Sequence, residues 1–505
     1  MFFYSFVFFL LLAPLYKAGN RPLPLMLLEL AAVGFLFVVA GVHRQPLSLP
    51  RTLWIAIGVL LGYPLVQLLP LPASLWAALP GHAEYATVLE KFAAPGVAGV
   101  SRAISIIPSA TEAGWLALLP PLACLLVVLR LATSQVARLL LLMTVFAGLE
   151  GFLGLMQVGT GGDSIFYLRN SQAYGTAVGT FVNRNHLAAM LAMTLPLIVG
   201  LLVFGMRPGR GRRHRKKLRL LAAGSEVLAQ RGLLFASAVM ILLCLIFTRS
   251  RAGIATTVIG LAFSSIVLVK VRVSSEGSSA NTYANWIVLA LVIVAVMLAA
   301  AIGLAPILER MEPEQLTLSA EGRLAIYAAT VRAAIEFLPF GSGLSTFADV
   351  FPQFQIGGFG GYVDHAHNDY LQAFMELGLA APIAIALLLS AYASRIVELL
   401  RREGGRSFDL LQIAAAVGML PMILHSLFDF ALHMPANALW FATLAGVMFH
   451  PGVAARERAP EGHRRHRSTA PKAAVAAAPE VVASEELAQI VEGLPPPGAG
   501  RRGAG

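Results

Sequence analysis

The sequence predicts an all-α polytopic membrane protein with about twelve transmembrane helices. Of the 505 residues, 57% are hydrophobic and only 13% are charged, and the mean hydropathy is +0.73. A soluble domain has roughly 25% charged residues. The apolar residues also form separate runs of about the 20 residues that a helix needs to cross a bilayer. These observations favour a multi-pass membrane protein over a soluble enzyme.

Twelve apolar runs are the expected spans. They cover residues 2–16, 23–41, 52–70, 113–130, 138–157, 186–206, 231–248, 252–270, 285–305, 370–394, 409–430 and 434–450. The first run is interpreted as a retained span rather than a signal peptide, because no basic segment precedes it. Residues 306–368 form a large loop between the ninth and tenth runs, in which short helices are expected.

The basic residues predict an orientation for these spans. The net charge of +11 could favour nucleic acid, but most of the 38 Lys and Arg residues lie in segments on one side of the expected spans. This positive-inside pattern places both chain ends in the cytoplasm and predicts no nucleic-acid partner. We expect a membrane domain over 1–450 and a disordered cytoplasmic tail over 451–505, which is rich in Ala, Pro, Gly and Arg. Cys124 and Cys244 lie within apolar runs and predict no disulfide framework.

The same orientation brings four polar clusters, distant in the sequence, to the outer face of the membrane. They are Asn183-Arg184-Asn185-His186, Thr248-Arg249-Ser250-Arg251, Asp364–Tyr370, and the trio His425, Asp429 and His433. Ionisable side chains at the rim of a membrane are costly unless they are used. We therefore expect the chemistry on this face.

Arginines on the outer face run against the positive-inside trend and require a local reason. The planar guanidinium groups of Arg184, Arg249 and Arg251 suit phosphate oxygens. They predict an anionic ligand at head-group depth, and a lipid-linked phosphate or diphosphate fits. The alternative is that each arginine extends to ordinary phospholipid head groups.

The large loop is expected to contain an amphipathic helix over about 322–337. Its apolar face recurs at three- to four-residue spacing and consists of Leu324, Ala328, Val331 and Ile335. Arg323 at the start of this helix could reach the phosphate-binding site, whereas Arg332 points about 180° away on a regular helix.

His365 and His367 are the candidate catalytic residues. A histidine that titrates near neutral pH can take a proton from an attacking hydroxyl, and Asp364 or Asp369 could orient its ring. The alternatives are a structural hydrogen-bond pair and a metal site. The metal site would use Asp364, Asp369 and His425 as further ligands, but no HExxH-like or Cys/His spacing supports it. General-base catalysis is the preferred interpretation.

Other polar residues are expected to support these groups. They are Asn368, Asp369, Asp364, His425, Asp429 and His186. Glu150 lies in the middle of the fifth apolar run, where an ionisable residue is functional by default. The alternative is that Glu150 is a protonated, hydrogen-bonded packing residue.

These motifs, in this order, resemble the bacterial O-antigen ligase and polymerase family, whose members are integral membrane enzymes that transfer lipid-linked glycans. The matching segments are Ile104–Pro108, Gly179–His186, Thr248–Gly253, Gly341–Gly343, His365–Leu371, Glu376–Gly378 and His425–Phe430. Their order and the topology are specific for the superfamily, but they do not separate a ligase from a polymerase.

The resemblance implies a glycan donor on undecaprenyl diphosphate, an acceptor hydroxyl on a saccharide or on lipid A core, and inversion at the anomeric carbon. It implies no metal and no other cofactor. The site would lie on the periplasmic face of the bacterial inner membrane. The family's diphosphate-binding arginines correspond to Arg251 and, less closely, to Arg184. Its essential histidine corresponds to His367, and His365 has no such counterpart.

The function that follows is an O-antigen ligase-like transfer of glycan in lipopolysaccharide or surface polysaccharide biosynthesis. Arg184 and Arg251, with Arg249 or Arg323, would neutralise the leaving diphosphate. His367 would orient or deprotonate the acceptor hydroxyl. The alternatives are a polysaccharide polymerase, a protein O-oligosaccharyltransferase and a twelve-span transporter. A transporter is disfavoured because the polar residues gather at the outer rim and no repeat relates the two halves of the chain.

Overall fold

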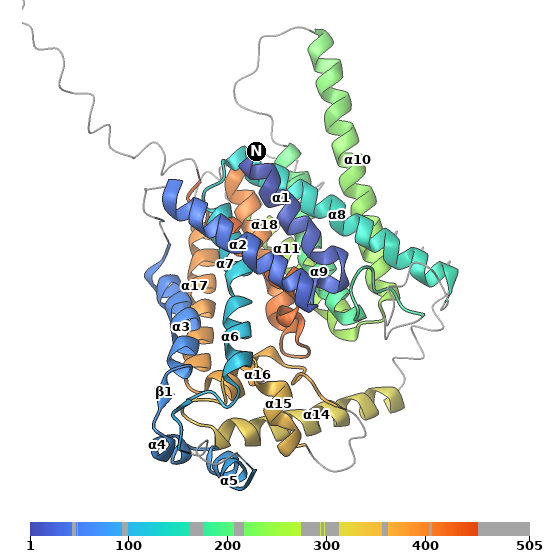
Figure 1. Cartoon of the computed structure of the whole chain (residues 1–505). Helices are drawn as coiled ribbons and strands as arrows, with labels where there is room; N and C mark the ends of the chain where they lie inside the picture. The colour runs from blue at the N-terminus through green and yellow to red at the C-terminus, as the bar shows by residue number, and fades with distance from the viewer. Residues whose placement is uncertain are drawn as a thin grey trace, which may run out of the picture. The chain divides into compact units, whose positions relative to one another are not determined.

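The computed structural model describes residues 1–42, 47, 49–92, 99–161, 175–206, 217–273, 293, 297, 313–355, 362–402 and 407–452. They belong to one compact unit, Met1–Ala455, which is almost entirely helical (Figure 1). Two short strands, β1 (Pro70–Leu71) and β2 (Arg102–Ala103), pair antiparallel, with Pro70 opposite Ala103. Nearly all of the expected tail over 451–505 lies outside the described residues, so its disorder and its boundary stay predictions.

Helices follow one another along the described chain. The α-helices are α1 (Phe2–Leu12), α2 (Pro22–Val42), α3 (Arg51–Gln67), α4 (Ala73–Ala77), α5 (Ala83–Phe92), α6 (Pro108–Leu116), α7 (Leu119–Val128), α8 (Thr133–Thr160), α9 (Arg184–Met206), α10 (Lys217–Phe247), α11 (Arg251–Val273), α14 (Pro313–Glu336), α15 (Phe347–Val350), α16 (Asp369–Leu377), α17 (Ala380–Arg401), α18 (Ser407–His425) and α19 (Pro435–Met448). The 3-10 helices are η1 (Ala13–Leu15), η2 (Lys17–Gly19), η4 (Phe351–Gln353) and η5 (Ala431–His433).

Seven helical segments among the described residues are long and apolar enough to cross a membrane. They are Pro22–Gly41, Pro108–Val128, Thr133–Thr160, Arg184–Leu202, Ala229–Phe247, Ala380–Arg401 and Phe408–His425, and three shorter apolar helices are Phe2–Leu15, Arg51–Gln67 and Arg251–Val267. Each of these segments overlaps an expected span. The expected span 434–450 is α19, which has 14 residues, and 285–305 lies outside the described residues except for 293 and 297. The total of twelve therefore stays a prediction.

The expected span over 370–394 is not one helix. The chain forms α16, turns at Gly378 and continues as α17. Gly378 has a φ of +54°, and a Cβ there would overlap the carbonyl oxygen of Pro339, so the turn requires glycine. α16 packs against α14 and α15 as well as α17. The polar cluster that precedes α16 therefore leads into a short helix that packs against α14, α15 and α17.

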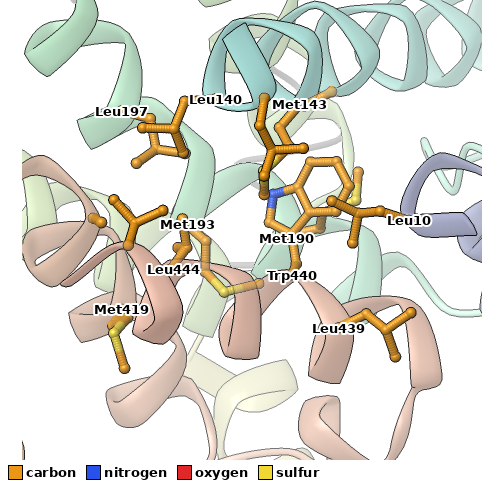
Figure 2. Packing of buried hydrophobic residues seen from close by; sticks show 14 of the residues in the cluster. Leu10, Leu140, Met143, Met190, Met193, Leu197, Met419, Leu439, Trp440 and Leu444 are labelled. Atoms are coloured by element: carbon orange, nitrogen blue, oxygen red, sulfur yellow. The ribbon is translucent and has the colours of Figure 1, made fainter. Parts of the chain in front are cut away.

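α9 lies at the centre of the apolar core. It packs against α8, α10, α11 and α18, and nearly all of Arg184–Leu202 is buried. Figure 2 shows Trp440 of α19 within this core, together with Leu10, Leu140, Met143 and Met190. The indole nitrogen of Trp440 donates to the Thr194 hydroxyl at 3.2 Å, so the buried polar group is satisfied. Because four helices hold α9, its first turn has a fixed position.

The loop helix expected over 322–337 is present as α14, Pro313–Glu336, but it buries a different face. The expected apolar face is exposed, with Leu324 at 62% and Ile335 at 61%. The buried face joins a second apolar cluster and consists of Ile326, Ala329, Ala333, Ala334 and Phe337. Alanines are small and let a neighbouring helix approach closely, so the alanine-rich face is the buried one. The sequence pattern missed this face because apolar periodicity does not distinguish small from large apolar residues.

Candidate functional site

Asp429 lies between α18 and η5 and is the centre of the polar cluster. Its side chain is fully buried. Oδ1 accepts from the backbone N–H of Phe430 at 2.9 Å and lies 3.3 Å from His367 Nδ1, while Oδ2 accepts from Asn185 Nδ2 at 2.6 Å. Burial alone would raise the pKa of Asp429, but the bond from His367 and the neighbouring histidines hold that pKa well below its usual range. Asp429 is therefore a carboxylate that stays ionised.

His367 lies in the turn before α16 and pairs with Asp429. Its φ is +50°, which is uncommon for a residue other than glycine. Two neighbours hold the turn: the Tyr327 hydroxyl donates to the His367 carbonyl oxygen at 2.8 Å, and the Asn368 side chain caps α16. Because Nδ1 faces a carboxylate, it carries the proton. Nε2 bonds no described residue and is not enclosed, so it presents a free lone pair.

The residue that orients His367 differs from the sequence expectation. Asp364 is exposed. Asp369 faces the other way, because α16 begins at this residue and its backbone N–H donates to the Ser426 carbonyl oxygen at 2.9 Å. Asp369 Oδ1 lies 2.7 Å from His433 Nδ1. Among the described residues, two aspartate–histidine pairs are thus within hydrogen-bonding distance, and His367 belongs to the one with Asp429.

Three histidine rings surround the Phe430 side chain. His365 stacks on it at 4.0 Å between ring centroids, while His367 and His186 meet it edge-on at 5.0 and 4.7 Å. His365 is largely buried, and this burial lowers its pKa to about 3. His186 Nε2 lies 3.9 Å from Asp429 Oδ1. Histidines from two of the expected polar clusters, Asn183–His186 and Asp364–Tyr370, therefore lie together.

Two of the expected phosphate-binding arginines begin adjacent helices. Arg184 is the first residue of α9 and Arg251 is the first residue of α11. A Cβ on Gly253 would lie 2.5 Å from Ala188 Cβ, so the first turns of the two helices are in close contact. Cations are normally unfavourable at a helix N-terminus. Two arginines beside two such termini therefore form a region suited to an anion.

Arg249 and Arg323 occupy different positions around this region. Arg249 lies in the turn between α10 and α11, with a φ of +53°, and its Nε is buried without a partner among the described residues. Arg323 of α14 is partly exposed, and its Nη2 lies 4.0 Å from Asp429 Oδ2. Arg323 therefore lies beside the Asp429 carboxylate, and its role at a phosphate stays a prediction. The exposed Arg332 donates to the Phe354 carbonyl oxygen at 3.2 Å.

Glu150 and His425 are two further candidate residues, and both are buried. Glu150 accepts from the backbone N–H and the hydroxyl of Thr180 at 2.9 and 2.8 Å. The Gln157 side chain donates to the carbonyl oxygen of Gly179 and accepts from its backbone N–H. These contacts brace the segment that leads into α9, and both interpretations of Glu150 stay predictions. His425 ends α18, is fully buried, and both its ring nitrogens lack a partner among the described residues.

Sequence reasoning assigned no role to several residues that contact the site. Asn185 holds Asp429, Tyr327 holds the His367 turn, and Gln372 bonds both His365 and His433. Gln372 lies one helical turn after Asp369, which was a usable signal. Within the described residues, no group of three His, Cys, Asp or Glu side chains is arranged to hold a metal ion.

The O-antigen ligase family model matches residues 236–388. The match supports an O-antigen ligase or polymerase family. This confirms the resemblance drawn from the motifs. The matched segment includes Arg251, Arg323, His365 and His367 and ends before Asp429. A comparison with curated proteins found no match.

Members of the O-antigen ligase family are glycosyl-transfer enzymes of O-antigen biosynthesis. The family covers ligases and polymerases, which act on lipid-linked polysaccharide. The family match and the apolar helices together indicate a multi-pass membrane protein.

Proposed function

We propose that this protein is an O-antigen ligase-like enzyme that transfers a glycan from undecaprenyl diphosphate to an acceptor hydroxyl. One observation carries the proposal. His367, paired with the buried carboxylate of Asp429, presents a free Nε2 beside the arginine-bearing start of α9. A base for an acceptor hydroxyl and a region for an anionic leaving group thus share one site.

His367 and Asp429 form the acceptor half of this site. Nε2 of His367 takes the proton of the acceptor hydroxyl as the oxygen attacks the anomeric carbon of the donor. Asp429 holds the ring in the required tautomer and stabilises the imidazolium that forms. Solvent later removes the proton. Attack opposite the leaving group inverts the anomeric carbon, and the reaction needs no metal.

The arginines form the donor half. Arg184 and Arg251 bind the diphosphate oxygens, and Arg249 and Arg323 assist them. The bond between the anomeric carbon and the phosphate oxygen breaks, and the electron pair leaves on the lipid diphosphate. Fixed guanidinium groups stabilise the charge that develops there. Diphosphate is a good leaving group, so positioning and electrostatics supply much of the rate.

The chemistry takes place on the periplasmic face of the inner membrane in this proposal, with both chain ends in the cytoplasm. The positive-inside distribution supports this orientation. Single cysteines introduced at Asp364 and at Ser407 test it with a membrane-impermeant thiol reagent on intact cells. The first is expected to react and the second to be protected. The reverse pattern would contradict the orientation.

A deletion strain tests the activity. Lipopolysaccharide, capsule and secreted polysaccharide are separated on gels, and the strain is complemented with wild type or with His367→Ala. Loss of all glycan ladders on lipid A core, with lipid-linked polymer accumulating, supports a ligase. A product with a single repeat indicates the polymerase instead. Full activity of His367→Ala would refute the assignment of the base.

A further inference from the structure

The side-chain amide of Gln372, in α16, makes four contacts with residues near the turn that contains His367. Its Oε1 accepts from the backbone N–H of Ala366 at 3.2 Å and lies 3.3 Å from His365 Nδ1. Its Nε2 donates to Glu376 Oε1 at 3.0 Å and lies 3.2 Å from His433 Nε2. The side chain is 2% exposed, so solvent does not replace these contacts.

Two of these contacts fix the orientation of the Gln372 amide. The backbone N–H of Ala366 can only donate and must face the amide oxygen. The Glu376 side chain accepts from the backbone N–H groups of Ser345 and Phe347 at 2.8 and 3.3 Å, so it must face the amide nitrogen. Rotating the amide by 180° would break both contacts. The positions of the amide oxygen and nitrogen are therefore determined.

This orientation sets the protons on both neighbouring histidines. His365 Nδ1 faces an oxygen, so it carries the hydrogen and leaves Nε2 bare. His433 Nδ1 donates to Asp369, and its Nε2 accepts from Gln372. Burial opposes the charged form of His433, but Asp369 and Glu376 give a net rise in its pKa. In this amide orientation, Nε2 of His433 is therefore the acceptor of a Gln372 amide hydrogen.

His365 is consequently a hydrogen-bond acceptor and not a second base. Burial lowers its pKa to about 3, so the ring is neutral at physiological pH. Its Nε2 bonds no described residue and is not an enclosed atom. His365 and His367 contact the same Phe430 ring, at 4.0 and 5.0 Å between centroids. The two histidine rings therefore lie on either the face or the edge of one phenylalanine ring.

We propose that His365 binds a second hydroxyl of the acceptor through its bare Nε2, and that Gln372 is the positioning residue that keeps this nitrogen unprotonated. This assignment rests on the proposed function and narrows its acceptor. One hydroxyl donates to His367 and reacts, while a nearby hydroxyl of the same molecule donates to His365. The acceptor is then a sugar with two neighbouring hydroxyls, and an isolated Ser or Thr hydroxyl of a protein lacks the second contact.

The proton positions are tested by ¹⁵N NMR of histidine-labelled protein in lipid bilayers, with His365→Phe used for assignment. We expect His365 to keep the Nδ1–H form between about pH 8 and pH 5, because its pKa is about 3. Gln372→Met should produce a mixture of tautomers. A wild-type His365 that carries its proton on Nε2, or titrates near neutral pH, would overturn the proposal.

The second hydroxyl is tested in a transfer assay with purified protein in vesicles and a lipid-diphosphate-linked glycan as donor. The acceptors are a saccharide that the wild type uses and its analogue without the neighbouring hydroxyl. His365→Phe should raise the KM of the full acceptor about tenfold, the effect of one lost hydrogen bond, and leave the donor KM unchanged. It should not change the KM of the deoxy analogue. Gln372→Met should reproduce the effect.

An equal loss with both acceptors would refute the hydroxyl assignment while leaving the proposed function intact. If the wild type transfers glycan to no acceptor, the proposed function and the hydroxyl assignment both fail. The NMR result does not depend on transfer, so it still decides whether Gln372 fixes the proton on His365.

Discussion

The two aspartate–histidine pairs of this protein have similar contacts and different surroundings. His367 Nδ1 lies 3.3 Å from Asp429, and His433 Nδ1 lies 2.7 Å from Asp369. Nε2 of His433 is occupied by Gln372 at 3.2 Å, whereas Nε2 of His367 bonds no described residue. A short contact with a carboxylate therefore does not identify a base. The freedom of the other ring nitrogen separates a group that can react from one that holds the structure.

The largest expected difference between the pairs comes from removing each histidine. His367→Ala should lower the transfer rate by at least about a hundredfold, because a general base contributes roughly 10²–10⁴. His433→Ala should lower it by about tenfold or less, because His433 acts only through Gln372. Initial rates of purified protein in vesicles measure both. Equal losses from the two variants would show that the pairs are not distinguished by their free nitrogen.

Replacing each carboxylate by its amide sharpens the comparison without changing the shape of the side chain. Asp429→Asn removes the charge that stabilises the imidazolium and permits the wrong tautomer of His367, so kcat should fall about a hundredfold or more. Asp369→Asn should change kcat only a few-fold, because the histidine that it contacts does not touch substrate. Both variants are compared at matched thermal stability. A larger loss from Asp369→Asn would reverse the assignment.

The donor half gives a contrast between the KM of the donor and the KM of the acceptor. Arg251→Ala should raise the donor KM about tenfold to a hundredfold, the effect of one lost charge-assisted contact, and leave the acceptor KM unchanged. Arg332→Ala is the matched control, because Arg332 is exposed on α14 and bonds only the Phe354 carbonyl oxygen among the described residues. An unchanged donor KM in Arg251→Ala would remove this arginine from the diphosphate site.

The polar clusters could be predicted from the sequence, but not which aspartate contacts which histidine. The apolar runs and the charge distribution predicted that the Asn183–His186 motif, His367 and Asp429 lie on the same face. In the structure, the Asn185 side chain donates to Asp429. The sequence offered Asp364 or Asp369 as the partner of His367, and only Asn368 lies between His367 and Asp369. Helix α16 begins between them, however, and turns Asp369 toward η5. The buried face of α14 was missed for a related reason, since contact between helices depends on residue size as well as on apolar spacing.

The smallest expected effect concerns the pH dependence of stability, and it separates His365 from His433. The pKa of His365 is about 3 in the folded protein and about 6.5 in an unfolded chain. Between these values the unfolded chain binds more protons, so stability falls as the pH drops below about 6.5. His365→Phe should therefore lose less thermal stability between about pH 7 and pH 4.5 than the wild type does. His433→Phe should not reduce this loss, because the pKa of His433 is raised rather than lowered. Melting temperatures in nanodiscs measure the difference, and an unchanged slope in His365→Phe would show that His365 is not held neutral by burial.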